Sequence, residues 1–90
     1  MKLKNFLKPL SANLDLVIVD VDGPKTSFNK HFPMIHRGVR DLGTARELRG
    51  TTSSWQNINS CKVVQVEETE LVSQEIPSKK YLAVYYRVQE

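Results

Sequence analysis

Three stretches of the chain carry the hydrophobic pattern of β-strands. Residues 14–21 are almost continuously apolar and β-branched, which is typical of an interior strand that is covered on both faces. Residues 81–88 fill both alternating sets of positions with large, mainly apolar side chains, and residues 61–67 alternate in a similar way. We expect these two later strands to pair antiparallel, with Leu71 and Val72 adding a short strand within their connection.

Two short helices are predicted from different signals. The first lies at the N-terminus, where apolar residues recur at the i, i+3, i+4 and i+7 positions of a helix: Leu3, Phe6, Leu7 and Leu10. Because Pro9 cannot continue a helix, we expect this one to end near Lys8.

The second helix is predicted from its capping residues. Thr44 and Glu47 have the spacing of a capping box, in which each side chain satisfies a backbone amide near the other. We therefore expect a helix over residues 44–49, ended by Gly50. Residues 24–32 are polar and fit either a loop or the return strand of a hairpin, and residues 51–60 fit a loop.

These elements predict a small α+β protein in a single domain, residues 1–90. We expect the N-terminal helix to pack on a mainly antiparallel sheet of three to five strands, with the second helix beside it. The chain of 90 residues is 40% hydrophobic and 26% charged, so it can build one modest core. A two-lobed enzyme is excluded by this length, and no apolar run is long enough to cross a membrane.

Basic residues are concentrated in the middle of the chain, although the net charge is only +3. Residues 24–62 contain seven Lys and Arg against two acidic residues, whereas residues 63–90 contain five Glu against three basic residues. A basic segment of this kind can meet an acidic partner, either nucleic acid or a protein surface. The alternative is an ordinary solvated face.

Candidate partner-binding residues lie in this basic segment. Arginine donates paired hydrogen bonds to carboxylates and phosphates, and Arg and Trp dominate the energetics of many interfaces. The candidates are Arg37, Arg40, Arg46, Arg49 and Trp55. Tyr81 and Tyr85 share a strand face and could stack on bases, but they fit equally a role in covering the sheet.

A short acidic motif follows the first predicted strand. The residues from Leu16 to Gly23 read Leu-Val-Ile-Val-Asp-Val-Asp-Gly, which resembles the first motif of the haloacid dehalogenase superfamily of phosphatases. The resemblance implies Asp20 as a nucleophile, Asp22 as a general acid/base and a magnesium ion between them. The rest of the chain departs from that family, and the alternative is a strand that ends in an Asp-Gly turn.

The candidate metal ligands are few and poorly spaced. His31, His36 and Cys61 do not match a structural zinc pattern, so we expect no metal and no cofactor. A single cysteine forms no internal disulfide and suits a reducing cytoplasm. The basic N-terminus lacks the uninterrupted apolar segment of a signal peptide, which also favours a cytoplasmic location, in a host cell.

The two ends of the chain resemble small accessory proteins of phages and mobile elements of Gram-positive bacteria. The resemblance rests on Lys-Leu-Lys-x-Phe-Leu-Lys from Lys2, the strand that follows it, Cys-Lys-Val-Val-Gln-Val from Cys61, and Tyr-Leu-Ala-Val-Tyr-Tyr-Arg-Val from Tyr81. Comparable small proteins include inhibitors of host defence nucleases, such as anti-CRISPR proteins, and the resemblance implies that this chain is encoded among proteins of that kind.

Together these observations favour a non-catalytic protein that blocks a host protein or a protein–nucleic acid complex through its basic surface. Direct binding of nucleic acid is the second hypothesis, and a phosphatase with Asp20 as nucleophile is the third. The sequence also leaves open a homodimer in which two copies pair through a sheet edge.

Overall fold

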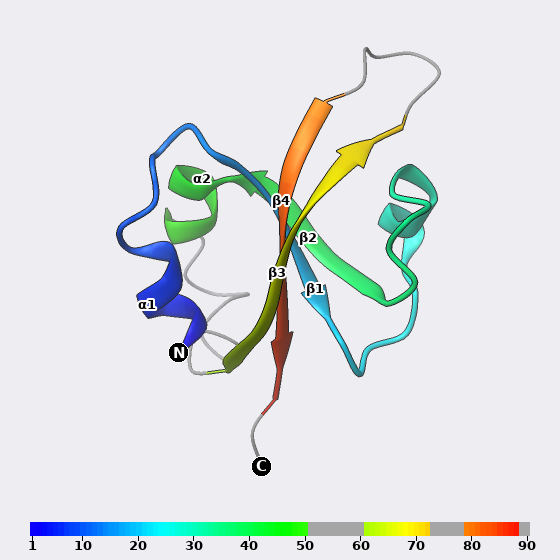
Figure 1. Ribbon diagram of the computed structural model, residues 1–90, viewed down its shortest axis with the longest axis horizontal. Coiled ribbons are helices and arrows are strands. Elements are labelled where there is room, and N and C mark those ends of the chain that lie inside the picture. Colours follow the sequence, from blue (N-terminus) through cyan, green and yellow to red (C-terminus); the bar gives the residue numbers. More distant parts are fainter. Residues whose placement is uncertain (51–60, 73–78, 89–90) are drawn as a thin grey trace.

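The chain forms a four-stranded mixed sheet with the strand order β2-β1-β4-β3, shown in Figure 1. The computed structural model describes residues 1–50, 61–72 and 79–88. The helices and strands, in chain order, are α1 (Leu3–Leu7), β1 (Asp15–Asp20), the 3-10 helix η1 (Ser27–His31), β2 (Gly38–Thr44), α2 (Ala45–Gly50), β3 (Lys62–Leu71) and β4 (Lys79–Arg87).

The sheet combines antiparallel and parallel pairing. Strand β1 runs antiparallel to β2 and parallel to β4, and β4 runs antiparallel to β3. The predicted antiparallel pairing of the last two strands is therefore confirmed. The α+β class is confirmed as well, with a sheet whose central pair is parallel.

Strand β1 is buried on both faces, as its sequence predicts. Val17 and Val19 lie on one face and Leu16 and Ile18 on the other, and all four side chains are fully buried. The strand lies between β2 and β4, so its backbone is paired on both sides and its side chains meet a separate cluster on each face.

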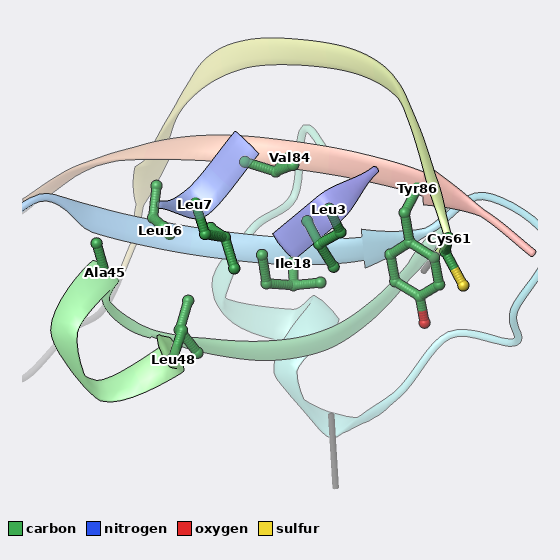
Figure 2. Close-up of a cluster of buried hydrophobic side chains, with 9 residues drawn as sticks. All are labelled: Leu3, Leu7, Leu16, Ile18, Ala45, Leu48, Cys61, Val84 and Tyr86. Carbon is green, nitrogen blue, oxygen red and sulfur yellow. The ribbon is translucent and has the colours of Figure 1, made fainter. Parts of the chain in front are cut away.

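One cluster lies on the sheet face that bears α1 and α2 (Figure 2). Its buried members are Leu3, Leu7, Leu16, Ile18, Ala45, Leu48, Cys61, Val84 and Tyr86. Helix α1 is only five residues long, and its two buried leucines lie one turn apart because residues i and i+4 share a helix face.

The second cluster lies on the opposite face, where η1 and the segment after it cover the sheet (Figure 1). Its buried members are Val17, Val19, Phe32, Ile35, Val39, Tyr81, Ala83 and Tyr85. The rings of Phe32 and Tyr81 meet edge to face, with centroids 5.5 Å apart, which is a favourable geometry for aromatic pairs.

Strand β2 leads directly into α2 through Thr44. The backbone amide of Glu47 donates to Thr44 Oγ1 at 3.2 Å, and the Thr44 hydroxyl donates to the Glu47 carboxylate at 3.1 Å. The predicted helix start is thus confirmed, with the two side chains bonded to each other. Thr44 also pairs with Asp15 in the sheet. The last residue of the strand therefore caps the helix that follows it.

Three predictions differ from the structure or lie outside it. Leu71 is the last residue of β3 and forms no separate strand, because pairing with β4 continues to Lys79. Residues 24–32 hold η1, and the return strand is β2, later in the chain. The predicted loop over residues 51–60, with Trp55, lies outside the described residues. No helix in the described ranges is both long enough and apolar enough to cross a membrane.

Candidate functional site

A bulge in β2 sets the position of Arg40. Ile18 pairs with Asp41 and Val19 pairs with Val39, so Arg40 is an extra residue without a partner in β1. A bulge of this kind turns two consecutive side chains towards one face and often occurs beside functional sites. The bulge lies opposite the last residues of β1, and the Arg40 side chain there is exposed.

Arg40 lines an open hollow of about 390 Å³. The hollow lies between the end of β1, the turn after it and the start of β2, and its lining residues are Asp20, Gly23, Pro24, Thr26, Gly38, Arg40 and Asp41. The backbone of the turn packs closely against Gly38, because a Cβ atom on Gly38 would lie 2.6 Å from the carbonyl oxygen of Pro24. Glycine at this position is what allows the turn to approach β2.

Among the described residues, no hydrogen bond or ion pair holds the Arg40 guanidinium, whereas the carboxylates around it are engaged. Asp20 Oδ1 accepts the backbone amide of Asp22 at 2.9 Å, and Asp41 Oδ1 accepts the amide of Leu42 at 2.8 Å. An unpaired guanidinium keeps its donors available for a carboxylate or phosphate group from outside.

Two buried titratable groups lie within the electrostatic reach of Arg40. Burial, followed by the charge of Asp20, raises the pKa of Tyr86 to about 12, while Arg40 acts in the opposite direction. Burial and Asp20 likewise raise the pKa of the Cys61 thiol, again opposed by Arg40. The Tyr86 hydroxyl is buried and makes no hydrogen bond of regular geometry in the described structure, although a hydrogen-bonding contribution from Asp20, the smallest of the causes, also raises its pKa. Figure 2 shows it beside Cys61 at the end of the cluster.

The two carboxylates of the phosphatase-like motif do not converge. Asp20 closes the turn by accepting the Asp22 amide, and the Asp22 carboxylate lies 3.4 Å from the side chain of Arg87. Asp22 is also missing from the lining of the hollow. This arrangement is the one expected for a strand that ends in an Asp-Gly turn.

The structure distributes the other candidate residues over the molecule. Arg37 donates to the carbonyl of Val21 at 3.2 Å and borders a hollow with Tyr85 on the η1 side of the sheet. Arg46 is exposed on α2, beyond the opposite end of β2. Arg49 is in the same helix, but its side chain lies outside what the structure describes, as does Trp55. Of the described candidates, Arg40 lines this hollow and neither Arg37 nor Arg46 does.

The histidines and the cysteine lie apart. His36 is exposed beside Arg37, the carbonyl of His31 accepts a hydrogen bond from the Val72 amide at 2.9 Å, and Cys61 is buried under α1. Within the described ranges, no three His, Cys, Asp or Glu side chains are grouped so that they could hold a metal ion.

Tyr81 and Tyr85 pack into the sheet and present no stacking platform. Both are buried, at 8% and 5% exposure. Tyr81 contacts Phe32, and the Tyr85 hydroxyl donates to the carboxylate of Glu67. The covering role considered from the sequence is therefore the one that these tyrosines have.

Comparison with known proteins identifies no relative of this chain, since no family model, curated protein or solved structure matches it. The site is therefore defined by its geometry alone.

Sequence reasoning proposed Arg40 as a contact but missed the bulge that positions it. The signal in the sequence is the spacing of two apolar residues, Val39 and Leu42, which are three positions apart. In the structure both face the same cluster. Residues on one strand face are normally separated by two positions, so a spacing of three within a strand indicates an inserted residue.

Proposed function

We propose that this protein is a non-catalytic binding protein that blocks a host macromolecule by occupying its surface. In this proposal it belongs with the small accessory proteins of phages and mobile elements, acts in the host cytoplasm, and holds α1 against the sheet as part of the scaffold. The partner is a host protein or a protein–nucleic acid complex that presents carboxylate or phosphate groups.

One observation carries the proposal: Arg40 is exposed, forms no ion pair with any residue that the structure describes, and is positioned by a bulge. A bulge interrupts regular pairing and re-aims a side chain, and such irregularities are common beside functional sites, so an exposed arginine placed there is a good candidate for a contact with a partner. An arginine at such a position can supply much of the binding energy of an interface.

The geometry favours a protein-blocking role over direct recognition of bases. The tyrosines that would stack on nucleic acid are buried, and Arg37 and Arg46 lie away from Arg40. A single arginine beside two carboxylates is better suited to one specific contact than to a path of phosphates.

The test is capture from bacterial lysate with tagged wild-type protein and with the single variants Arg40→Glu and Arg46→Glu, followed by mass spectrometry. Arg40→Glu should reduce capture of the specific partner at least tenfold, because the guanidinium is replaced by a repelling charge. Arg46→Glu makes the same charge change at the other end of β2 and is the matched control. Both variants should retain the wild-type melting temperature within a few degrees.

Nuclease treatment of the lysate separates the alternatives. A protein that is retained after treatment and lost with Arg40→Glu supports the proposal and identifies the target. Equal capture by wild type and Arg40→Glu would contradict it. Loss of all captured material on nuclease treatment would replace it with direct nucleic-acid binding.

A further inference from the structure

We propose that the outer edge of β3 binds an extended, basic segment of a partner protein, which adds to the sheet as another strand. This surface is on the opposite edge of the sheet from β2 and Arg40, so it is independent of the contact proposed above. The two edges of the sheet differ in how far the chain's own groups hydrogen-bond to them.

The edge at β2 is covered near its start by the chain's own side chains. Val39 donates its amide to Asn29 Oδ1 at 3.1 Å and accepts the Thr26 hydroxyl at its carbonyl. Asn29 also accepts the Thr26 amide at 2.8 Å, which fixes the start of η1 across this edge. These bonds satisfy backbone groups that would otherwise be open to another strand.

Within the part of the chain that the structure describes, backbone hydrogen bonds hold the edge at β3 only at its two ends. Near its start, the Val63 amide donates to the carbonyl of Met1, and just after its last residue the Val72 amide donates to the carbonyl of His31, both at 2.9 Å. Between these ties β3 pairs with β4 alone among the described strands. Amides on a strand point alternately to the two sides, so those of Val66, Glu68 and Glu70 point outward with that of Val72.

The charge of this edge selects the occupant. Glu67, Glu68 and Glu70 are exposed on β3, and no basic residue follows Lys62 within the strand. A second copy of the chain would place glutamates opposite glutamates, which destabilises cross-strand pairs. Lysine or arginine on an added strand would instead lie opposite them, which stabilises such pairs.

Apolar surface on both sides of the edge supports the same occupant. Val66, on the face that bears the helices, is 39% exposed, and Met34, on the η1 side, is 77% exposed. Met34 and three glutamates of β3 border one open hollow of about 340 Å³. An added strand would cover Val66 with one set of its side chains and Met34 with the other.

The probe for this proposal is a capped octapeptide in which lysine alternates with valine, labelled for fluorescence anisotropy. Lysines on one face would meet Glu68 and Glu70, and valines on the other would meet Met34. The matched peptide alternates glutamate with valine. Two further lysine peptides are N-methylated at one or the other set of alternate amides, which removes the donors on one edge at a time.

We expect the lysine peptide to bind at least tenfold more tightly than the glutamate peptide. Glu68→Lys should lower its affinity at least tenfold, and Asp22→Lys, the same charge change at an exposed remote position, less than twofold. One N-methylated peptide should lose binding while the other retains it. Hydrogen exchange at the Val66, Glu68 and Glu70 amides should slow at least tenfold when the peptide is bound.

Three results would overturn the proposal. Binding that survives both patterns of N-methylation would show that backbone pairing is not involved. Equal losses of peptide affinity in Glu68→Lys and Asp22→Lys would show that the peptide responds only to the net charge of the protein. Concentration-dependent dimerisation that protects the same three amides without peptide would assign the edge to a second copy of this chain.

Discussion

Tyr85 and Tyr86 are consecutive in β4, yet their hydroxyl groups lie on opposite faces of the sheet and have opposite hydrogen-bonding environments. Tyr85 donates to the carboxylate of Glu67 on the neighbouring strand, whereas the Tyr86 hydroxyl is buried and makes no hydrogen bond of regular geometry in the described structure. Because the two residues are alike in type and burial, they form a matched pair for measuring what a hydrogen bond contributes here.

Tyr85→Phe should destabilise the protein. The substitution leaves the ring in place and removes the donor to Glu67, a bond whose net contribution is about 1–2 kcal/mol when the acceptor is charged. Denaturant unfolding should show a lower midpoint with an unchanged slope. An unchanged midpoint would mean that water replaces the lost donor without cost.

Tyr86→Phe should leave the free energy of unfolding unchanged or raise it by up to about 1 kcal/mol. A buried hydroxyl without a partner loses its bonds to water on folding and regains none, so its removal relieves that cost. The same denaturant titration measures it. A loss of more than about 1 kcal/mol would show that the hydroxyl has a partner after all.

Alkaline pH should destabilise the fold through the same residue. Burial and Asp20 raise the pKa of Tyr86 to about 12, above the unfolded value of about 10. The neutral form therefore stabilises the fold fully below pH 10, and this contribution is lost as pH rises towards 12. A two-unit difference corresponds to about 2–3 kcal/mol.

Thermal unfolding measured from pH 8 to pH 12 tests this dependence. Tyr85 and Cys61, whose pKa values burial also raises, add to the loss in the same direction. Tyr86→Phe should make the decline between pH 10 and 12 shallower than in wild type. Parallel curves for the two proteins would contradict the assignment to Tyr86.

Alanine substitutions at two glycines of β2 should destabilise the protein to different extents. At Gly38 a Cβ atom would lie 2.6 Å and 2.9 Å from backbone carbonyl oxygens, which cannot move aside cheaply. At Gly43 the nearest atom is 3.2 Å away at the flexible end of Glu47. Gly38→Ala should cost about 2–3 kcal/mol and Gly43→Ala less than about 1 kcal/mol, measured by thermal unfolding. Similar melting temperatures for the two variants would contradict the close approach of the turn at Gly38.

The elements that the sequence predicts well are those whose signals are local. The apolar run before Asp20 identifies an interior strand because strands with one solvated face typically alternate apolar and polar residues. Thr44 and Glu47 identify the start of α2 because a capping pair acts within one turn. The pattern of residues 81–88 assigns side chains correctly to the two faces of β4.

What the sequence does not predict depends on pairing between distant segments. Strand β2 contains Arg40, Asp41 and two glycines, a composition typical of a loop, and it is held in the sheet by β1. The parallel alignment of β1 with β4 joins residues such as Leu16 and Leu82 and has no local signature. The hollow beside Arg40 requires both the bulge and the turn at Gly23, so it emerges only when these segments meet.

The position of β4 in the middle of the sheet has a consequence for synthesis. While residues 1–72 are emerging from the ribosome, β1 can pair only with β2, and β3 has no neighbour among the described strands. Both hydrophobic clusters also lack their β4 members until residues 79–87 arrive. The nascent chain therefore exposes apolar side chains of β1 until translation of β4, and the sheet closes only when β4 inserts between β1 and β3.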